Sequence, residues 1–100
     1  EEVDEGDEIA KALGDKKVAI LQNHGILTTG PSVDIALWFY MSMERCCQAQ
    51  LMAEAAGKPI SVSHETAVKT REFIANDIAA WASYQPAFDK IVKMQPDLLD

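Results

Sequence analysis

Asn23, His24 and Gly25 are the one place in this sequence where a side chain able to bind a metal stands at the edge of a rigid element. The apolar run at 18–21 favours a strand, which puts His24 at or just beyond the strand end. Gly25 permits a sharp turn, and Asn23 tolerates the left-handed conformation and can hold a neighbouring group. A neutral imidazole presented in this way is a common zinc ligand. The spacing alone favours the simpler alternative, a turn histidine that hydrogen-bonds a carbonyl group.

The elements that must position this corner follow from local patterns. Gly14 ends a first amphipathic helix, Ser32 and Ser63 are expected N-caps, and Pro86 is expected to begin a final short helix. We therefore predict strands over 17–22 and 26–29 and helices over 3–13, 33–56, 64–84 and 87–94.

The string from Leu21 to Ala36, LQNHGILTTGPSVDIA, followed by a long apolar helix that carries Glu44, resembles the class II aldolase/adducin family. The resemblance covers residues 17–56 well and the flanks loosely. It implies an α/β fold that is part of a three-layer α/β/α domain with a central, mostly antiparallel sheet. It makes residues 1–100 the C-terminal part of such a domain, with the N-terminal part absent and 61–100 as a helical C-terminal extension.

The resemblance also implies a metal role for His24. In the enzymes of the family, the histidine of Asn-His-Gly is one of three that hold a divalent ion, usually zinc. The other two form an upstream His-x-His pair, which this chain lacks, and the catalytic acid is also expected upstream. The other histidine, His64, has no counterpart in the family pattern. We therefore expect these 100 residues alone to be inactive and to bind zinc poorly.

Two further residues are candidates with alternatives left open. Glu44 lies in an apolar helix, so its carboxylate is expected to need an ion pair or a backbone hydrogen bond. Alternatively, it orients the metal-bound imidazole of His24 without contacting the metal itself. In some enzymes of the family a C-terminal tyrosine reaches a neighbouring subunit's site, and Tyr84 is the catalytic candidate by position. Alternatively, Trp81, Tyr84 and Phe88 form an aromatic patch that packs on another subunit.

The activity that the resemblance implies is that of a metal-dependent lyase of aldolase type. Such an enzyme cleaves or forms a carbon–carbon bond through an enediolate, in a small hydroxylated carbonyl compound such as a sugar or sugar phosphate. A related epimerase with the same retro-aldol chemistry fits equally well. A third alternative is a non-catalytic, adducin-like oligomerisation module.

Composition limits the classes of molecule that the chain can bind. The net charge is −7 and no basic cluster occurs, which argues against nucleic acid and anionic membrane surfaces. The 48% hydrophobic content exceeds what 100 residues can bury alone, so we expect a homo-oligomer, and the resemblance suggests a homotetramer. The longest apolar run, 35–43, is too short to span a bilayer. Cys46 and Cys47 are predicted to be small core residues whose unpaired thiols favour the cytoplasm.

Overall fold

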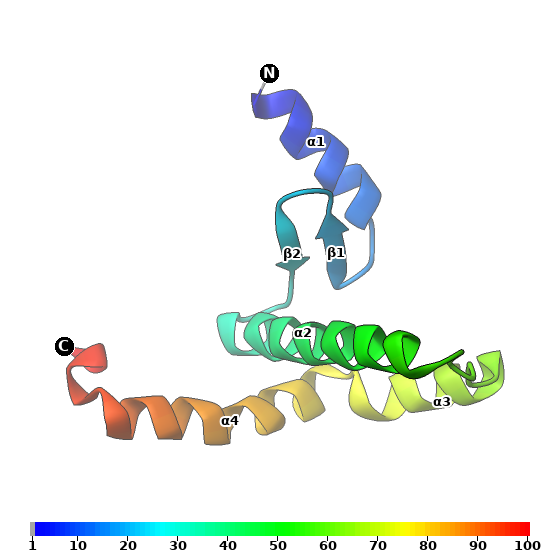
Figure 1. Cartoon of the computed structure of the whole chain (residues 1–100). Helices are drawn as coiled ribbons and strands as arrows, with labels where there is room; N and C mark the ends of the chain where they lie inside the picture. The colour runs from blue at the N-terminus through cyan, green and yellow to red at the C-terminus, as the bar shows by residue number, and fades with distance from the viewer. Residues whose placement is uncertain (1) are drawn as a thin grey trace.

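A computed structural model describes the backbone of residues 2–100 and the side chains of residues 4–100. The elements in chain order are α1 (Glu2–Leu13), β1 (Val18–Leu21), β2 (Gly25–Thr28), α2 (Val33–Ala56), α3 (His64–Ile74), α4 (Asp77–Met94) and a 3₁₀ turn, η1 (Pro96–Leu99). Figure 1 shows the hairpin β1–β2 standing on one side of α2, while α3 and α4 run along the other side. Helix α1 extends beyond the hairpin, at the end remote from α2.

The strands β1 and β2 form a two-stranded antiparallel sheet. Val18 pairs with Thr28 at the base of the hairpin, and Leu21 pairs with Gly25 at its tip. The Thr28 hydroxyl donates to the Ala36 carbonyl oxygen at 2.9 Å, which fastens the base of the hairpin to the first turn of α2. The predicted strands are confirmed to within one residue. The described residues are compatible with part of an α/β domain, and the three-layer arrangement stays a prediction.

The buried core is small and lies where α2 crosses α4 beneath the hairpin. Only Ile35, Phe39 and Ala80 are buried among the residues with described side chains. Partly buried apolar neighbours complete this core: Val18, Trp38 and Ala75. The C-terminal half of α2 is largely exposed, and there Cys46 is exposed and Cys47 is half-buried. The prediction that both cysteines are core residues is therefore wrong for this chain, because the core is confined to the N-terminal half of α2.

The helical boundaries after residue 60 differ from the prediction. A continuous helix over 64–84 was expected, but α3 ends at Ile74 and α4 begins at Asp77. Asn76 makes this break: its side-chain oxygen accepts from the Ala79 N–H at 2.9 Å, and its amide donates to the Phe73 carbonyl oxygen at 2.8 Å. One side chain thus satisfies backbone groups at the ends of both helices.

The prediction that Pro86 begins a helix is wrong, because Pro86 lies inside α4. A proline in a helix interior removes one backbone hydrogen bond because it has no N–H group. The helix continues on both sides of Pro86, so the loss of this one backbone N–H donor does not end α4.

The two predicted serine caps behave differently. Ser63 caps α3 as expected, because its Oγ accepts from the Thr66 N–H at 3.2 Å. Ser32 occupies the N-cap position of α2 in an extended conformation but makes no capping hydrogen bond. Instead, Asp34 Oδ1 accepts from the Ile35 N–H at 3.2 Å. No helix in the described part of the chain is long and apolar enough to cross a bilayer.

Candidate functional site

The tip of the hairpin is a tight turn that fixes the backbone on both sides of His24. The His24 N–H donates to the Leu21 carbonyl oxygen at 3.2 Å, which closes the turn. Asn23 occupies the third position of this turn with φ of 63°, and Gly25 follows with φ of 140°. A positive φ at that turn position favours glycine or asparagine. Asn23, a residue type that tolerates the left-handed conformation, thus adopts it here.

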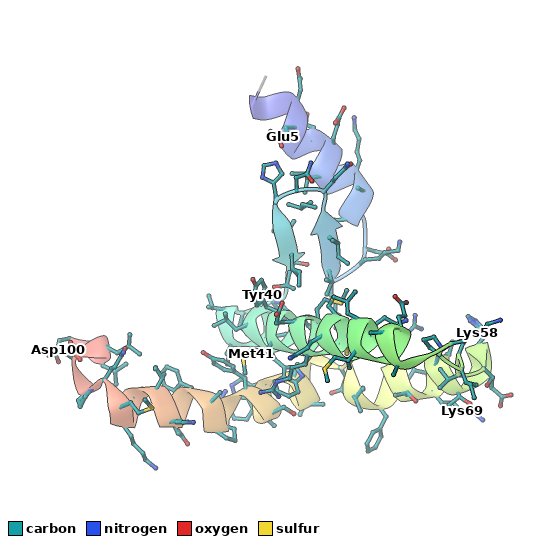
Figure 2. The ribbon with its side chains drawn as sticks, in the orientation of Figure 1. Glu5, Tyr40, Met41, Lys58, Lys69 and Asp100 are labelled. Carbon is teal, nitrogen blue, oxygen red and sulfur yellow. The ribbon has the colours of Figure 1, made fainter. Side chains whose placement is uncertain are left out.

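His24 is exposed at this tip and lines an open hollow of about 740 Å³ between the hairpin and α1. Figure 2 labels Glu5 on α1, next to the tip of the hairpin. The two acidic residues of the hollow, Glu5 and Glu8, are three positions apart on α1 and therefore share one helix face. The other lining residues are Ile9, Ala12, Ile20, Leu21 and Gln22. His24 thus shares this hollow with two carboxylates on the wall that α1 forms.

This wall attracts cations but does not by itself complete a metal site. The negative charges of Glu5 and Glu8 raise the local concentration of positive ions around His24. Among residues 4–100, however, no three histidine, cysteine, aspartate or glutamate side chains gather closely enough to hold a metal ion. A catalytic zinc ion takes about three protein ligands. His24 therefore fits one ligand position, and the described residues do not fit a complete site.

The structure does not bring the other predicted site residues to His24. Glu44 is exposed on α2, does not line the hollow, and has no ion-pair or hydrogen-bond partner for its side chain within the described part of the chain. Tyr84 lies on α4 and packs near Phe88, with ring centroids 6.4 Å apart and an interplanar angle of 42°. Their roles beside His24 stay predictions. His64 is an exposed residue in the first turn of α3.

Glu5 and Glu8 were missed as neighbours of His24. Acidic residues near the start of a helix are favoured by the helix dipole, so their presence there needs no contact with another element. The available signal was their spacing of three residues, which puts both on one face of a helix that leads directly into the strand before His24. Only the packing of α1 against β1 shows that this face borders the hairpin tip.

Comparison with known sequences settles the family. Residues 1–51 match the sequence model described as "Class II Aldolase and Adducin N-terminal domain". The chain belongs to the class II aldolase and adducin family. The matched range contains both strands, the corner at His24 and most of α2. The resemblance carried by the Asn-His-Gly string is confirmed, and which part of the family's domain residues 1–100 form stays a prediction.

Several relatives are similar over nearly the whole chain. It is 39% identical over 95 residues to "Decarboxylase NovR" of Streptomyces niveus and 37% identical over 95 residues to "4-hydroxy-3-prenylphenylpyruvate oxygenase/4-hydroxy-3-prenylbenzoate synthase" of Streptomyces roseochromogenus subsp. oscitans. Both matches cover 95% of this chain, and 35% and 34% of the respective relatives. The chain thus spans about a third of the length of the curated relatives it matches.

The fold also matches a solved class II aldolase. The L-fuculose 1-phosphate aldolase from Glaciozyma antarctica PI12 superposes with a TM-score of 0.87 and 37% sequence identity. The match covers 91% of this chain and 36% of the aldolase. The hairpin and the helices that follow it therefore have the arrangement found in a class II aldolase over the matched residues.

Proposed function

We propose that the protein that contains these residues is a metal-dependent lyase of aldolase type, in which His24 supplies one ligand of a divalent ion such as zinc. The observation that carries the proposal is the fixed corner at Asn23–Gly25, which holds an exposed imidazole beside an acidic wall. Family membership and the similarity to a sugar-phosphate aldolase support the reaction class. The remaining ligands and the catalytic acid come from sequence outside these 100 residues.

The chemistry requires a sink for negative charge. Breaking a carbon–carbon bond next to a carbonyl group leaves an electron pair that must delocalise onto the carbonyl oxygen. A bound divalent ion supplies the Lewis acid for that oxygen. In this chain, His24 would hold its ligand position, and the left-handed Asn23 would fix the direction of the imidazole. The carboxylates of Glu5 and Glu8 would favour a cation over an anion in the hollow.

The name of one relative, "Decarboxylase NovR", favours a second candidate reaction, a decarboxylation. Loss of carbon dioxide from a carbon next to a carbonyl group leaves the same kind of electron pair as aldol cleavage. One site could therefore serve either reaction, and the substrate would decide between a hydroxylated carbonyl compound and an oxo acid. Product analysis separates the candidates, since an aldolase releases an aldehyde and a decarboxylase releases carbon dioxide. A retro-aldol epimerase would release neither.

The direct test of the metal role is elemental analysis of the full-length protein purified without added metal. We expect about one divalent ion per chain, lost in His24→Ala and retained in the control His64→Ala. Equal metal content in the wild type and His24→Ala would overturn the assignment of His24. Metal-free wild-type protein without activity on sugar phosphates or oxo acids would favour the adducin-like module. Size measurement of the same samples tests the proposed homotetramer.

A further inference from the structure

A second hollow lies at the base of the hairpin, at the opposite end of β1 from His24. Its volume is about 560 Å³, within the usual size range of small-molecule sites, and it opens where the start of β1 meets α2 and the α3–α4 junction. Its lining residues are Asp15, Lys16, Lys17, Val18, Phe39, Arg71, Glu72, Ala75 and Asn76. The proposed lyase chemistry uses none of them.

The floor of this hollow is apolar and firmly held. Phe39 belongs to the core, with Val18 and Ala75 packed against that core. The Lys17 ammonium lies 4.6 Å from the centroid of the Phe39 ring and donates to the Ala75 carbonyl oxygen at 2.9 Å. It also lies 3.2 Å from Asp77 Oδ1, so the charge of Lys17 is already compensated. Lys17 therefore lines the hollow, but its ammonium group is not free to bind an anionic ligand.

Two other cations line the hollow and are poorly compensated. Arg71 has no hydrogen-bond or ion-pair partner for its guanidinium within residues 4–100. Lys16 approaches only its neighbour Asp15, at 3.7 Å, and both side chains are largely exposed, so this pair contributes little. Since Lys17 is paired with Asp77, the other charged side chains that line the hollow are the cations Lys16 and Arg71 and the carboxylates Asp15 and Glu72, in a protein whose total charge is −7.

We propose that this hollow binds a small organic acid with a single carboxylate and a flat apolar body. The apolar body lies on Val18, Ala75 and the part of Phe39 that borders the hollow beside Lys17, and the carboxylate meets Arg71 and Lys16. A planar guanidinium matches a carboxylate with two parallel hydrogen bonds, which makes arginine suited to this contact. Inorganic phosphate has the negative charge but no apolar body that could lie on the floor of the hollow.

The test uses the two arginines of the chain, Arg45 and Arg71, as site and internal control. The full-length protein is treated with 2,3-butanedione, which modifies exposed guanidinium groups, and each arginine is followed by peptide mass spectrometry. Benzoate is the probe, and benzamide has the same shape without the charge. We expect saturating benzoate to slow modification of Arg71 by about tenfold and to leave Arg45, exposed on α2, unchanged. Benzamide and inorganic phosphate should protect neither.

Variants locate the second contact. Lys16→Gln should raise the benzoate concentration for half-protection of Arg71 by about tenfold, because a charged hydrogen bond is lost. Lys69→Gln, on the same helix as Arg71 but paired with Glu65 at 2.7 Å, should leave it unchanged. Equal protection by benzamide or by phosphate, equal slowing at Arg45, or no effect of Lys16→Gln would overturn the proposal. None of these measurements depends on catalytic activity or on the metal at His24.

Discussion

Asn23 adopts the left-handed conformation next to His24. Its substitution by glycine should therefore be tolerated better than its substitution by alanine. An alanine at φ of 63° carries a steric penalty of about 1 kcal/mol or more, which glycine avoids. We expect Asn23→Ala to lower the free energy of unfolding by about 1 kcal/mol and to weaken metal binding by the full-length protein. Asn23→Gly should do neither. Urea denaturation of both variants measures the difference, and an alanine variant as stable as the glycine variant would show that the corner tolerates another backbone geometry.

The Ser32 hydroxyl lowers the pKa of Asp34 below its ordinary value of 3.8, with smaller contributions from backbone N–H groups and Gln85. A lowered pKa in the folded state means that the charged carboxylate stabilises the fold above pH about 3.8, and that this contribution is lost as the pH falls through the folded value. We expect Ser32→Ala to raise the pKa of Asp34 more than Gln85→Ala does, as followed by carbon NMR of the carboxyl group. The reverse order would contradict the assigned cause.

At the scale of elements, Lys17 joins the hairpin to α2 and to the α3–α4 junction. Its ammonium contacts the Phe39 ring, the Ala75 carbonyl oxygen and the Asp77 carboxylate, although the side chain is 41% exposed. Allowing for that exposure, we expect Lys17→Met to lower the free energy of unfolding by about 1 kcal/mol. The control Lys69→Met breaks a largely exposed pair and should cost less than about 0.5 kcal/mol. Equal losses in thermal denaturation would mean that Lys17 does not join these elements.

The elements that sequence predicted correctly have local causes. Gly14 ends α1, the apolar run 18–21 forms β1, and Ser63 caps α3, each through groups within a few residues. The break between α3 and α4 was missed because apolar residues continue at helical spacing on both sides of Asn76, whose capping role depends on one side chain. Pro86 lies inside α4 and does not mark its start, since an established helix tolerates the loss of one donor.

The two hollows could not be predicted for a different reason. The sequence identified His24 from its turn, but Glu5 and Glu8 line the same hollow only through the packing of α1 beside the hairpin. Likewise, Lys16 and Arg71 are 55 positions apart, and they line one hollow only because α3 ends beside the base of β1. Local propensity contains no information about such distant pairs. The sequence motifs therefore predicted the turn at His24 but not the residues that other elements bring close to it.

At the scale of the whole molecule, the chain is extended and exposes much of its apolar surface. Its radius of gyration is 16.3 Å, whereas a compact domain of this length has about 13 Å. Phe73 and Ile78 are 81% and 80% exposed and line one apolar hollow of about 630 Å³ across the α3–α4 junction. A contiguous apolar surface of this kind is costly in water and drives association.

We therefore expect the 100-residue chain to self-associate at micromolar concentration, and the double variant Phe73→Ser/Ile78→Ser to shift it towards monomer in sedimentation velocity experiments. The matched control is Val33→Ser/Ile60→Ser, which also removes two exposed apolar side chains, 77% and 96% exposed, from outside this hollow. If both double variants sediment like the wild type, the junction is not the associating surface. A shift produced only by the first variant would locate that surface at the α3–α4 junction, on the side of α2 away from the hairpin, which would leave the tip at His24 accessible in the assembly.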